Sequence, residues 1–146
     1  DYFQFYLQDE AAPGDLFDAW NPGAVERMIA VADGVVGFGT VRNMEVPVTL
    51  ELRDDAPAPD LDGFDHVVEA ALLMRGASLV VAGCTDHLPD AARFALAPGS
   101  YRVRLSASGL DTLSANGLDG DDRYLVQVWP AAPAEPVVRK QRRTGP

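Results

Sequence analysis

The clearest indication of the fold is the stretch at residues 28–41, which reads MIAVADGVVGFGTV. Two apolar runs, at 28–32 and 35–41, flank the dipeptide Asp33-Gly34. An Asp-Gly pair readily adopts the positive φ angles of a two-residue turn, and apolar β-branched residues favour strands. The stretch therefore predicts a β-hairpin in the first third of the chain.

The segments on either side of this hairpin give further local predictions. Residues 2–8 alternate, with Phe3, Phe5 and Leu7 on one face, which predicts a half-buried strand. Asn21-Pro22 suits the start of a short helix that runs to about residue 27, because Asn can cap and Pro fits the first turn. Residues 45–52 alternate again. Pro47 lacks an amide donor, so we expect this strand at a sheet edge or with that position facing out.

The middle of the chain is more ambiguous. Residues 64–74 fit both a helical stripe and a strand, and the surrounding hairpins favour a strand that pairs through Arg75-Gly76 with residues 78–83. Residues 93–96 and 101–105 predict another hairpin, which turns at Pro98-Gly99 and directs Tyr101, Val103 and Leu105 inward.

A loop rich in Gly, Ser, Asp and Asn follows at residues 106–122, and the last strand is expected at 124–129. About eight short strands with turn signals at regular intervals, and at most one short helix, indicate an all-β fold. We therefore predict an antiparallel β-sandwich, with an open barrel as the related alternative.

Charge is distributed unevenly along the chain. Residues 1–135 hold all 22 acidic residues and only eight arginines, so their net charge is 8 − 22 = −14. The other four positive charges follow at Arg139, Lys140, Arg142 and Arg143. We expect a single domain at 1–138 and a basic tail at 139–146 that is either solvated or folded against the acidic body. Such a body repels nucleic acid and anionic lipid and favours a basic protein partner.

Cysteine content and hydropathy bear on the compartment. Cys84 is the one cysteine, so no internal disulfide can form, which is typical of a reducing compartment. No apolar run approaches the roughly 18 residues that a membrane span needs. We expect a cytoplasmic protein.

The sequence contains only weak signals of a catalytic or metal-binding site. Cys84 and His87 are three residues apart, and His66 is a possible third member of a metal or nucleophile site. Zinc sites usually show two spaced ligand pairs, so a buried cysteine beside a surface histidine is the favoured interpretation. Residues 119–122 resemble a calcium-binding turn in composition but lack its ladder of ligands. We predict no catalytic residue, no metal and no cofactor.

Gly34, Gly37 and Gly39 are spaced like the glycines of a phosphate-binding loop. They lie inside an expected strand, however, and no Lys-Ser/Thr follows them. We expect them to permit close packing of neighbouring segments or a bulge.

The order of these features resembles the competence protein J family. The resemblance rests on the aromatic strand at residues 2–5, Trp20, the hairpin at 30–38, Arg42-Asn43 and the edge strand at 46–52. It covers about residues 2–52, and later segments share the order of strands and turns with few identical residues. Members of the family are protein inhibitors of a competence-associated nuclease, so the resemblance implies a non-enzymatic inhibitor.

The acidic body suggests how such an inhibitor binds. We hypothesise that carboxylates occupy the site on a basic partner that normally receives phosphates, a mapping that rests on charge and not on the family. The candidate partner-binding residues are Asp54, Asp55, Asp60, Asp62, Asp119, Asp121 and Asp122.

Three classes of function follow from the sequence. The leading prediction is an acidic, non-enzymatic protein that inhibits a basic partner such as a nuclease or a nuclease-like toxin, with no direct binding to nucleic acid or membrane. The alternative is a β-sandwich that binds a small molecule or carbohydrate through aromatic and polar groups. A hydrolase or metal enzyme centred on Cys84, His87 and His66 is the third.

Overall fold

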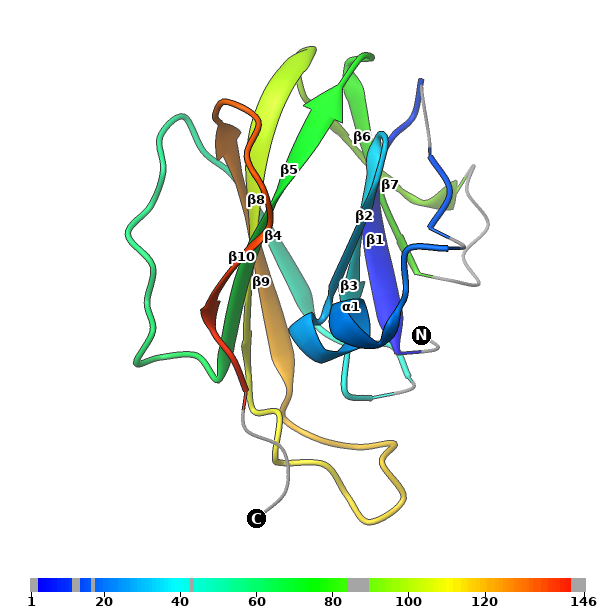
Figure 1. Cartoon of the computed structure of the whole chain (residues 1–146). Coiled ribbons are helices and arrows are strands. Elements are labelled where there is room, and N and C mark those ends of the chain that lie inside the picture. The colour runs from blue at the N-terminus through cyan, green and yellow to red at the C-terminus, as the bar shows by residue number, and fades with distance from the viewer. Residues whose placement is uncertain (1–2, 12–13, 17, 43, 84–89, 143–146) are drawn as a thin grey trace.

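The chain folds into two β-sheets that pack face to face (Figure 1). The computed structural model describes residues 3–11, 14–16, 18–42, 44–83 and 90–142. Sheet A has the strand order β2-β3-β1-β6-β7 and sheet B the order β10-β5-β8-β9-β4. The predicted β-sandwich is therefore confirmed. Among the described residues it has ten strands and one short helix.

The elements have the following bounds. They are β1 (Gln4–Asp9), α1 (Pro22–Arg27), β2 (Ile29–Ala32), β3 (Val35–Gly39), β4 (Val48–Leu52), β5 (His66–Met74), β6 (Ser78–Gly83), β7 (Ala92–Ala95), β8 (Gly99–Ser108), β9 (Arg123–Pro130) and β10 (Val137–Lys140).

The hairpin and the helix form where the sequence predicted them. β2 and β3 pair antiparallel, and Gly34 in the turn has a φ of 75°. Helix α1 begins after Asn21, whose side-chain oxygen accepts a hydrogen bond from Ala24 N at 2.9 Å. It ends at Met28, which adopts the left-handed conformation and donates its N–H to the last turn. Local capping and turn chemistry thus decide both elements.

Glycines of β3 permit close packing, as expected. A Cβ atom at Gly37 would lie 2.6 Å from Leu16 and 3.0 Å from Trp20. These two side chains therefore lie against the outer face of sheet A, where any larger residue would push them away.

The predicted pairing of residues 64–74 with 78–83 is wrong. β5 lies in sheet B, whereas β6 lies in sheet A beside β1. The carboxylate of Asp9 explains the crossing, because it accepts the amides of Arg75 at 2.7 Å and Gly76 at 3.1 Å. These bonds direct the chain from one layer to the other. Burial alone would raise the pKa of Asp9, but the three backbone amides that it accepts, from Arg75, Gly76 and Ala11, lower it.

The predicted hairpin across Pro98-Gly99 is also wrong. β7 pairs with β6 in sheet A, and β8 lies between β5 and β9 in sheet B. An alternating strand looks the same whether the next strand joins its own sheet or the facing one, so local pattern cannot separate the two. The inward direction of Tyr101, Val103 and Leu105 is nevertheless confirmed.

β4 lies at the edge of sheet B, as Pro47 predicted, but it runs parallel to its neighbour β9.

A second difference concerns Phe3, which was expected to face inward with Phe5 and Leu7. Its φ of 63° breaks the alternation before the strand begins, and its side chain is 53% exposed.

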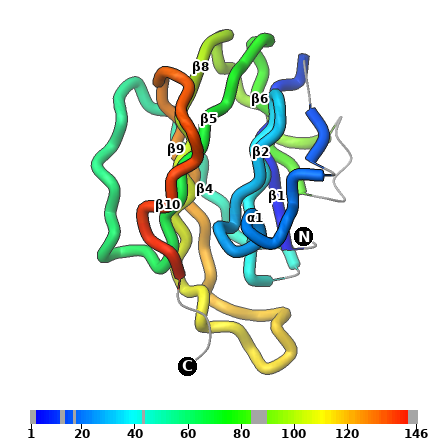
Figure 2. Tube along the Cα trace, in the orientation of Figure 1, coloured from blue at the N-terminus to red at the C-terminus, as the bar shows by residue number. Residues whose placement is uncertain are grey.

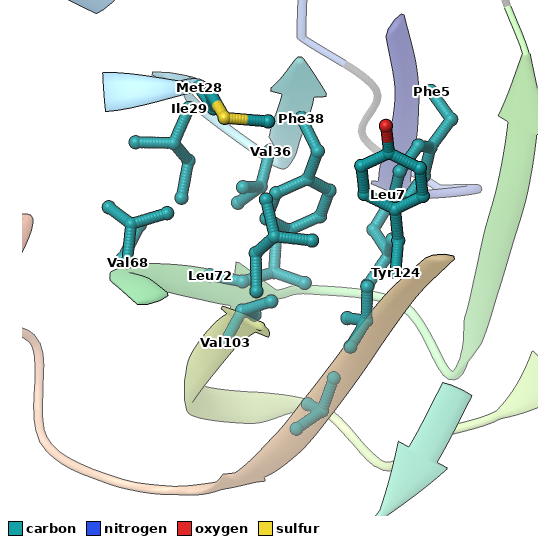
Figure 3. Packing of buried hydrophobic residues seen from close by; sticks show 14 of the residues in the cluster. Phe5, Leu7, Met28, Ile29, Val36, Phe38, Val68, Leu72, Val103 and Tyr124 are labelled. Carbon is teal, nitrogen blue, oxygen red and sulfur yellow. The ribbon is translucent and has the colours of Figure 1, made fainter. Parts of the chain in front are cut away.

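The core lies between the sheets (Figure 3). Phe5 and Phe38 come from neighbouring strands of sheet A, and their ring centroids are 5.2 Å apart. Tyr124 of sheet B packs edge-on against Phe5 at 6.0 Å. Aliphatic side chains from both sheets fill the rest, among them Leu7, Val36, Val68, Leu72 and Val103.

The outer face of sheet B carries a buried cluster of charges. Glu69 of β5 accepts hydrogen bonds from Arg102 at 3.3 Å, Arg104 at 2.8 Å and Arg139 at 3.3 Å. Burial alone would raise the pKa of Glu69, but the hydrogen bonds and charges of these arginines hold it below its ordinary value. Arg104 also lies over the ring of Trp129, 4.8 Å from its centroid.

We predict that Glu69→Gln destabilises the fold by about 3–5 kcal/mol, because it leaves Arg102 and Arg104 buried without a countercharge. Urea unfolding at pH 7 measures the effect. Glu51→Gln is the matched control, since the ion pair of Glu51 with Arg53 is exposed and is worth less than about 1 kcal/mol. Equal losses in the two variants would contradict this role for Glu69.

Candidate partner-binding surface

Strand register defines the two ends of the sandwich. His66 pairs with Ala107 and Ser108 pairs with Arg123, so the starts of β5 and β9 share one end, here called the His66 end. Met74 pairs with Gly99 at the opposite end, here called the Met74 end. β4 finishes at the Met74 end, because Leu52 pairs with Val128 near the end of β9.

The acidic loop at residues 53–65 runs along the outside of sheet B from the Met74 end to the His66 end (Figure 2). Two cations hold its backbone. Arg104 Nη1 donates to the carbonyl of Pro57 at 2.8 Å, and Lys140 Nζ donates to the carbonyl of Leu61 at 2.6 Å. Since the carbonyls face these cations, the loop is fixed in place with its aspartates outside. Asp54, Asp55, Asp60 and Asp62 are all exposed.

A second acidic loop, at residues 109–122, joins β8 to β9 at the His66 end (Figure 1). Its own hydrogen bonds keep it compact. Thr112 Oγ1 donates to the carbonyl of Gly109 at 2.7 Å and accepts the amide of Asp121 at 2.8 Å. Gly109 has a φ of 67°, which favours glycine at this turn. Asp119 and Asp121 are exposed.

Asp122 differs from the other candidates because it is buried. Its carboxylate lies 2.9 Å from Arg42 Nε and accepts a hydrogen bond from the Tyr124 hydroxyl at 2.8 Å. The same hydroxyl accepts the amide of Val41 at 3.0 Å. Burial raises the pKa of Tyr124 well above its ordinary value. The Asp122 carboxylate therefore joins the end of β3 to the start of β9 and is withdrawn from the surface.

The structure divides the remaining candidates between the two ends. Lys140 pairs with Val67 and holds Leu61, so Asp60 and Asp62 lie toward the His66 end with Asp119 and Asp121. Asp54 and Asp55 follow Arg53 just after β4, at the Met74 end. The seven residues thus do not form one patch.

The ion pairs within the molecule involve other acids and not these exposed carboxylates. Exposed or half-exposed pairs join Arg53 to Glu51, Arg75 to Asp33 and Arg93 to Glu10, while the remaining pairs involve Arg42 and the Glu69 cluster. In the described part of the chain, the six exposed candidates make no ion pair with any arginine or lysine. A negative field therefore projects from both loops into solvent.

Two further acids at the His66 end were not among the candidates. Asp65 directly precedes β5 and accepts the amide of Leu110 at 3.1 Å, and Asp111 follows Leu110 in the second loop. Both line a hollow of about 430 Å³ with Lys140 and Arg142. The sequence did not single them out, because Asp65 falls in the segment 64–74 that was predicted as a strand and Asp111 is one of several polar residues of the loop predicted at 106–122. Only strand register brings the two loops to one end.

The residues of the possible metal or nucleophile site are only partly described. Cys84 and His87 lie outside the described residues, whereas His66 is fully buried. Its Nδ1 accepts the amide of Arg142 at 3.0 Å, so Nε2 carries the hydrogen and donates to the carbonyl of Arg27 at 2.6 Å. Both ring nitrogens are thus used by the backbone. The described residues contain no group of three or more His, Cys, Asp or Glu side chains placed to hold a metal ion.

His66 connects three segments of the His66 end: the start of β5, the end of α1 and the chain that follows β10. Burial, together with the charge of Arg142, lowers the pKa of His66 despite its bond to the Arg27 carbonyl. A histidine that remains neutral in the folded state stabilises the fold above its unfolded pKa of about 6.5. That contribution is lost as the pH falls toward the folded pKa.

We predict that wild type loses more stability than His66→Gln between pH 7.5 and pH 5.5. Below about pH 6.5 the difference grows by up to about 1.4 kcal/mol per pH unit, because only the wild type must keep a neutral imidazole. Urea unfolding at a series of pH values measures it, and the carboxylates common to both proteins cancel in the subtraction. Parallel pH profiles would show that His66 titrates alike in the folded and unfolded chains.

Sequence comparisons identify no relative, since no family model and no curated protein match this chain. Two solved structures share its fold. ComJ of Bacillus subtilis, an inhibitor of the DNA-degrading activity of NucA, matches with a TM-score of 0.69 and 18% identity over 90% of each chain.

A protein described as crocagin biosynthetic gene J matches with a TM-score of 0.56 and 18% identity, over 89% of this chain and 92% of its own. No helix among the described residues is long and apolar enough to cross a membrane. The resemblance to competence protein J, which the sequence showed over residues 2–52, thus extends to the fold of nearly the whole chain, and this protein is similar to ComJ in its architecture.

Proposed function

We propose that this protein is a non-enzymatic inhibitor that binds a basic protein partner, such as a nuclease or a nuclease-like toxin, in the cytoplasm. The observation that carries the proposal is a set of exposed carboxylates without countercharges on two ordered loops of a sandwich similar to ComJ. ComJ inhibits a nuclease, which supports the same kind of partner here.

The His66 end is the proposed contact surface. Asp60, Asp62, Asp119 and Asp121 lie toward it, and the cations that hold the first loop are directed at its backbone. Nucleases bind phosphates through clusters of basic side chains, and carboxylates on ordered loops are complementary to such clusters. The inhibitor would then bind where the nucleic-acid backbone binds.

Electrostatic attraction of this kind acts mainly on the rate of association. Complementary charges raise the rate at low ionic strength, and salt screens them over roughly 8–10 Å. Asp54 and Asp55, at the Met74 end, add to the overall field without contacting the partner.

The fourfold variant Asp60→Asn, Asp62→Asn, Asp119→Asn, Asp121→Asn tests the proposal. We expect its association rate with a basic nuclease to fall by about tenfold or more and to lose most of its salt dependence. Inhibition of DNA degradation and surface plasmon resonance provide the measurements. The nucleases to assay are NucA of Bacillus subtilis and the basic nucleases of the organism that encodes this chain.

The matched control removes the same number of charges from the Met74 end, with Glu10→Gln, Asp33→Asn, Asp54→Asn and Asp55→Asn. This variant keeps inhibition and most of the association rate. Equal losses in the two variants would show that only net charge matters and would reject the His66 end as the contact surface. Unimpaired DNA degradation with every nuclease would reject the proposed inhibition.

A further inference from the structure

A pocket opens at the His66 end, beside the 109–122 loop. Its walls come from the start of β1, helix α1, the end of β3 and the loop after β8. The lining residues include Phe3, Trp20, Val25, Met28, Leu113 and Arg142. Its volume is about 580 Å³, within the range of about 300–1,000 Å³ that is usual for small-molecule sites.

The walls of this pocket are mainly apolar, although they face solvent. Val25 is 60% exposed and Phe3 is 53% exposed, the two largest exposures among the large hydrophobic residues of the described chain. Isolated exposed hydrophobic residues are common, but these two line one concave surface together with Met28 and Leu113. Apolar surface gathered in a hollow is typical of a ligand site.

Backbone conformation also distinguishes the pocket. Among the described residues, Phe3 and Met28 are the two non-glycine residues with positive φ, at 63° and 62°. Met28 closes helix α1 in this conformation, but Phe3 caps no helix. Non-glycine residues in the left-handed region cost roughly 1–3 kcal/mol and occur preferentially at ligand-binding sites. The unusual conformation of Phe3 places its ring at the pocket instead of in the core.

The charge of the pocket is opposite to that of the surrounding loops. Arg142 is the one charged residue among the described residues that line it. His66 fixes the backbone of Arg142 on one side and the end of helix α1 on the other, so both walls are held by the same buried imidazole. Asp65 and Asp111 lie in the neighbouring hollow, and neither forms an ion pair with Arg142 in the described part of the chain.

Two hydrogen-bond donors in the pocket walls have no acceptor. The indole Nε1 of Trp20 and the Nε of Arg142 are buried and bond to no described residue. A buried donor without an acceptor costs about 1–3 kcal/mol, so an acceptor brought by a ligand would relieve that cost after a small shift of the walls. Donors and a cation, set in apolar walls, are complementary to an apolar molecule that carries an anionic group.

We propose that this pocket binds a small apolar carboxylate, with its apolar body against Phe3, Val25 and Leu113 and its carboxylate at Arg142. This site is separate in chemistry from the acidic surface, which attracts basic proteins. It does not depend on the proposed inhibition of a nuclease.

Decanoate is the first probe, and decylammonium is its counterpart with the same chain and the opposite charge. Both are titrated below their micelle concentrations by isothermal calorimetry. We expect decanoate to bind saturably at one site, with an affinity at least tenfold higher than that of decylammonium. The fluorescence of Trp20 should change on binding, and Trp20→Phe should remove that change.

Two variants locate the site. Arg142→Gln keeps the backbone N–H that His66 accepts and removes the cation, so decanoate affinity should fall about tenfold or more. Arg123→Gln removes a cation at the same end outside the pocket and should leave affinity unchanged. Val25→Asp places a carboxylate at the opening and should abolish binding, whereas Leu73→Asp, on another exposed apolar residue at the Met74 end, should not.

Three results would overturn the proposal. The first is no saturable binding of decanoate by the folded wild type. The second is equal affinity for decanoate and decylammonium, which would indicate nonspecific binding to an apolar surface. The third is an affinity that Arg142→Gln and Val25→Asp leave unchanged, which would place the decanoate elsewhere on the molecule.

Discussion

The buried carboxylate of Glu69 is the interaction on which the outer half of this structure depends. It accepts hydrogen bonds from three arginines, and two of these also donate to backbone carbonyls of segments that cover sheet B. Arg104 reaches Pro57 of the acidic loop, and Arg102 reaches Ala134 and Glu135 before β10. One negative charge thus keeps two cations in place under the segments whose carbonyls they bind.

That arrangement explains how a strongly acidic chain presents ordered carboxylates. Most arginines of the body are used inside the molecule, either at Glu69, at Asp122 or in surface ion pairs. The six exposed candidate aspartates form no ion pair in the described part of the chain, while the loop backbones are held by cations and by local hydrogen bonds. Order without neutralisation is the property that a steering surface requires, because a mobile loop would lose entropy on binding.

The His66 end combines two chemically different surfaces. One is formed by the exposed aspartates of the acidic loops, and the other is the apolar pocket with Arg142. His66 connects them through two hydrogen bonds to the backbone, and these bonds account for its burial. Among the described residues, His66 belongs to no group of side chains placed to hold a metal ion. A ligand in the pocket and a protein on the loops would both contact segments that this imidazole positions. The two surfaces differ in chemistry because the loops expose carboxylates without ion-pair partners, whereas the pocket exposes apolar side chains.

The sequence by itself determined the local elements: the hairpin at 28–41, the capped helix, the edge position of β4 and the acidity of the loops. Each follows from interactions within a few residues, such as a turn dipeptide, a capping side chain or alternation along a strand. Only the tertiary structure decided that β5 and β6 join different sheets, that Asp122 is buried and that Phe3 faces a pocket. These outcomes depend on contacts between distant segments, such as Asp9 with the amides of Arg75 and Gly76, which leave no trace in local periodicity.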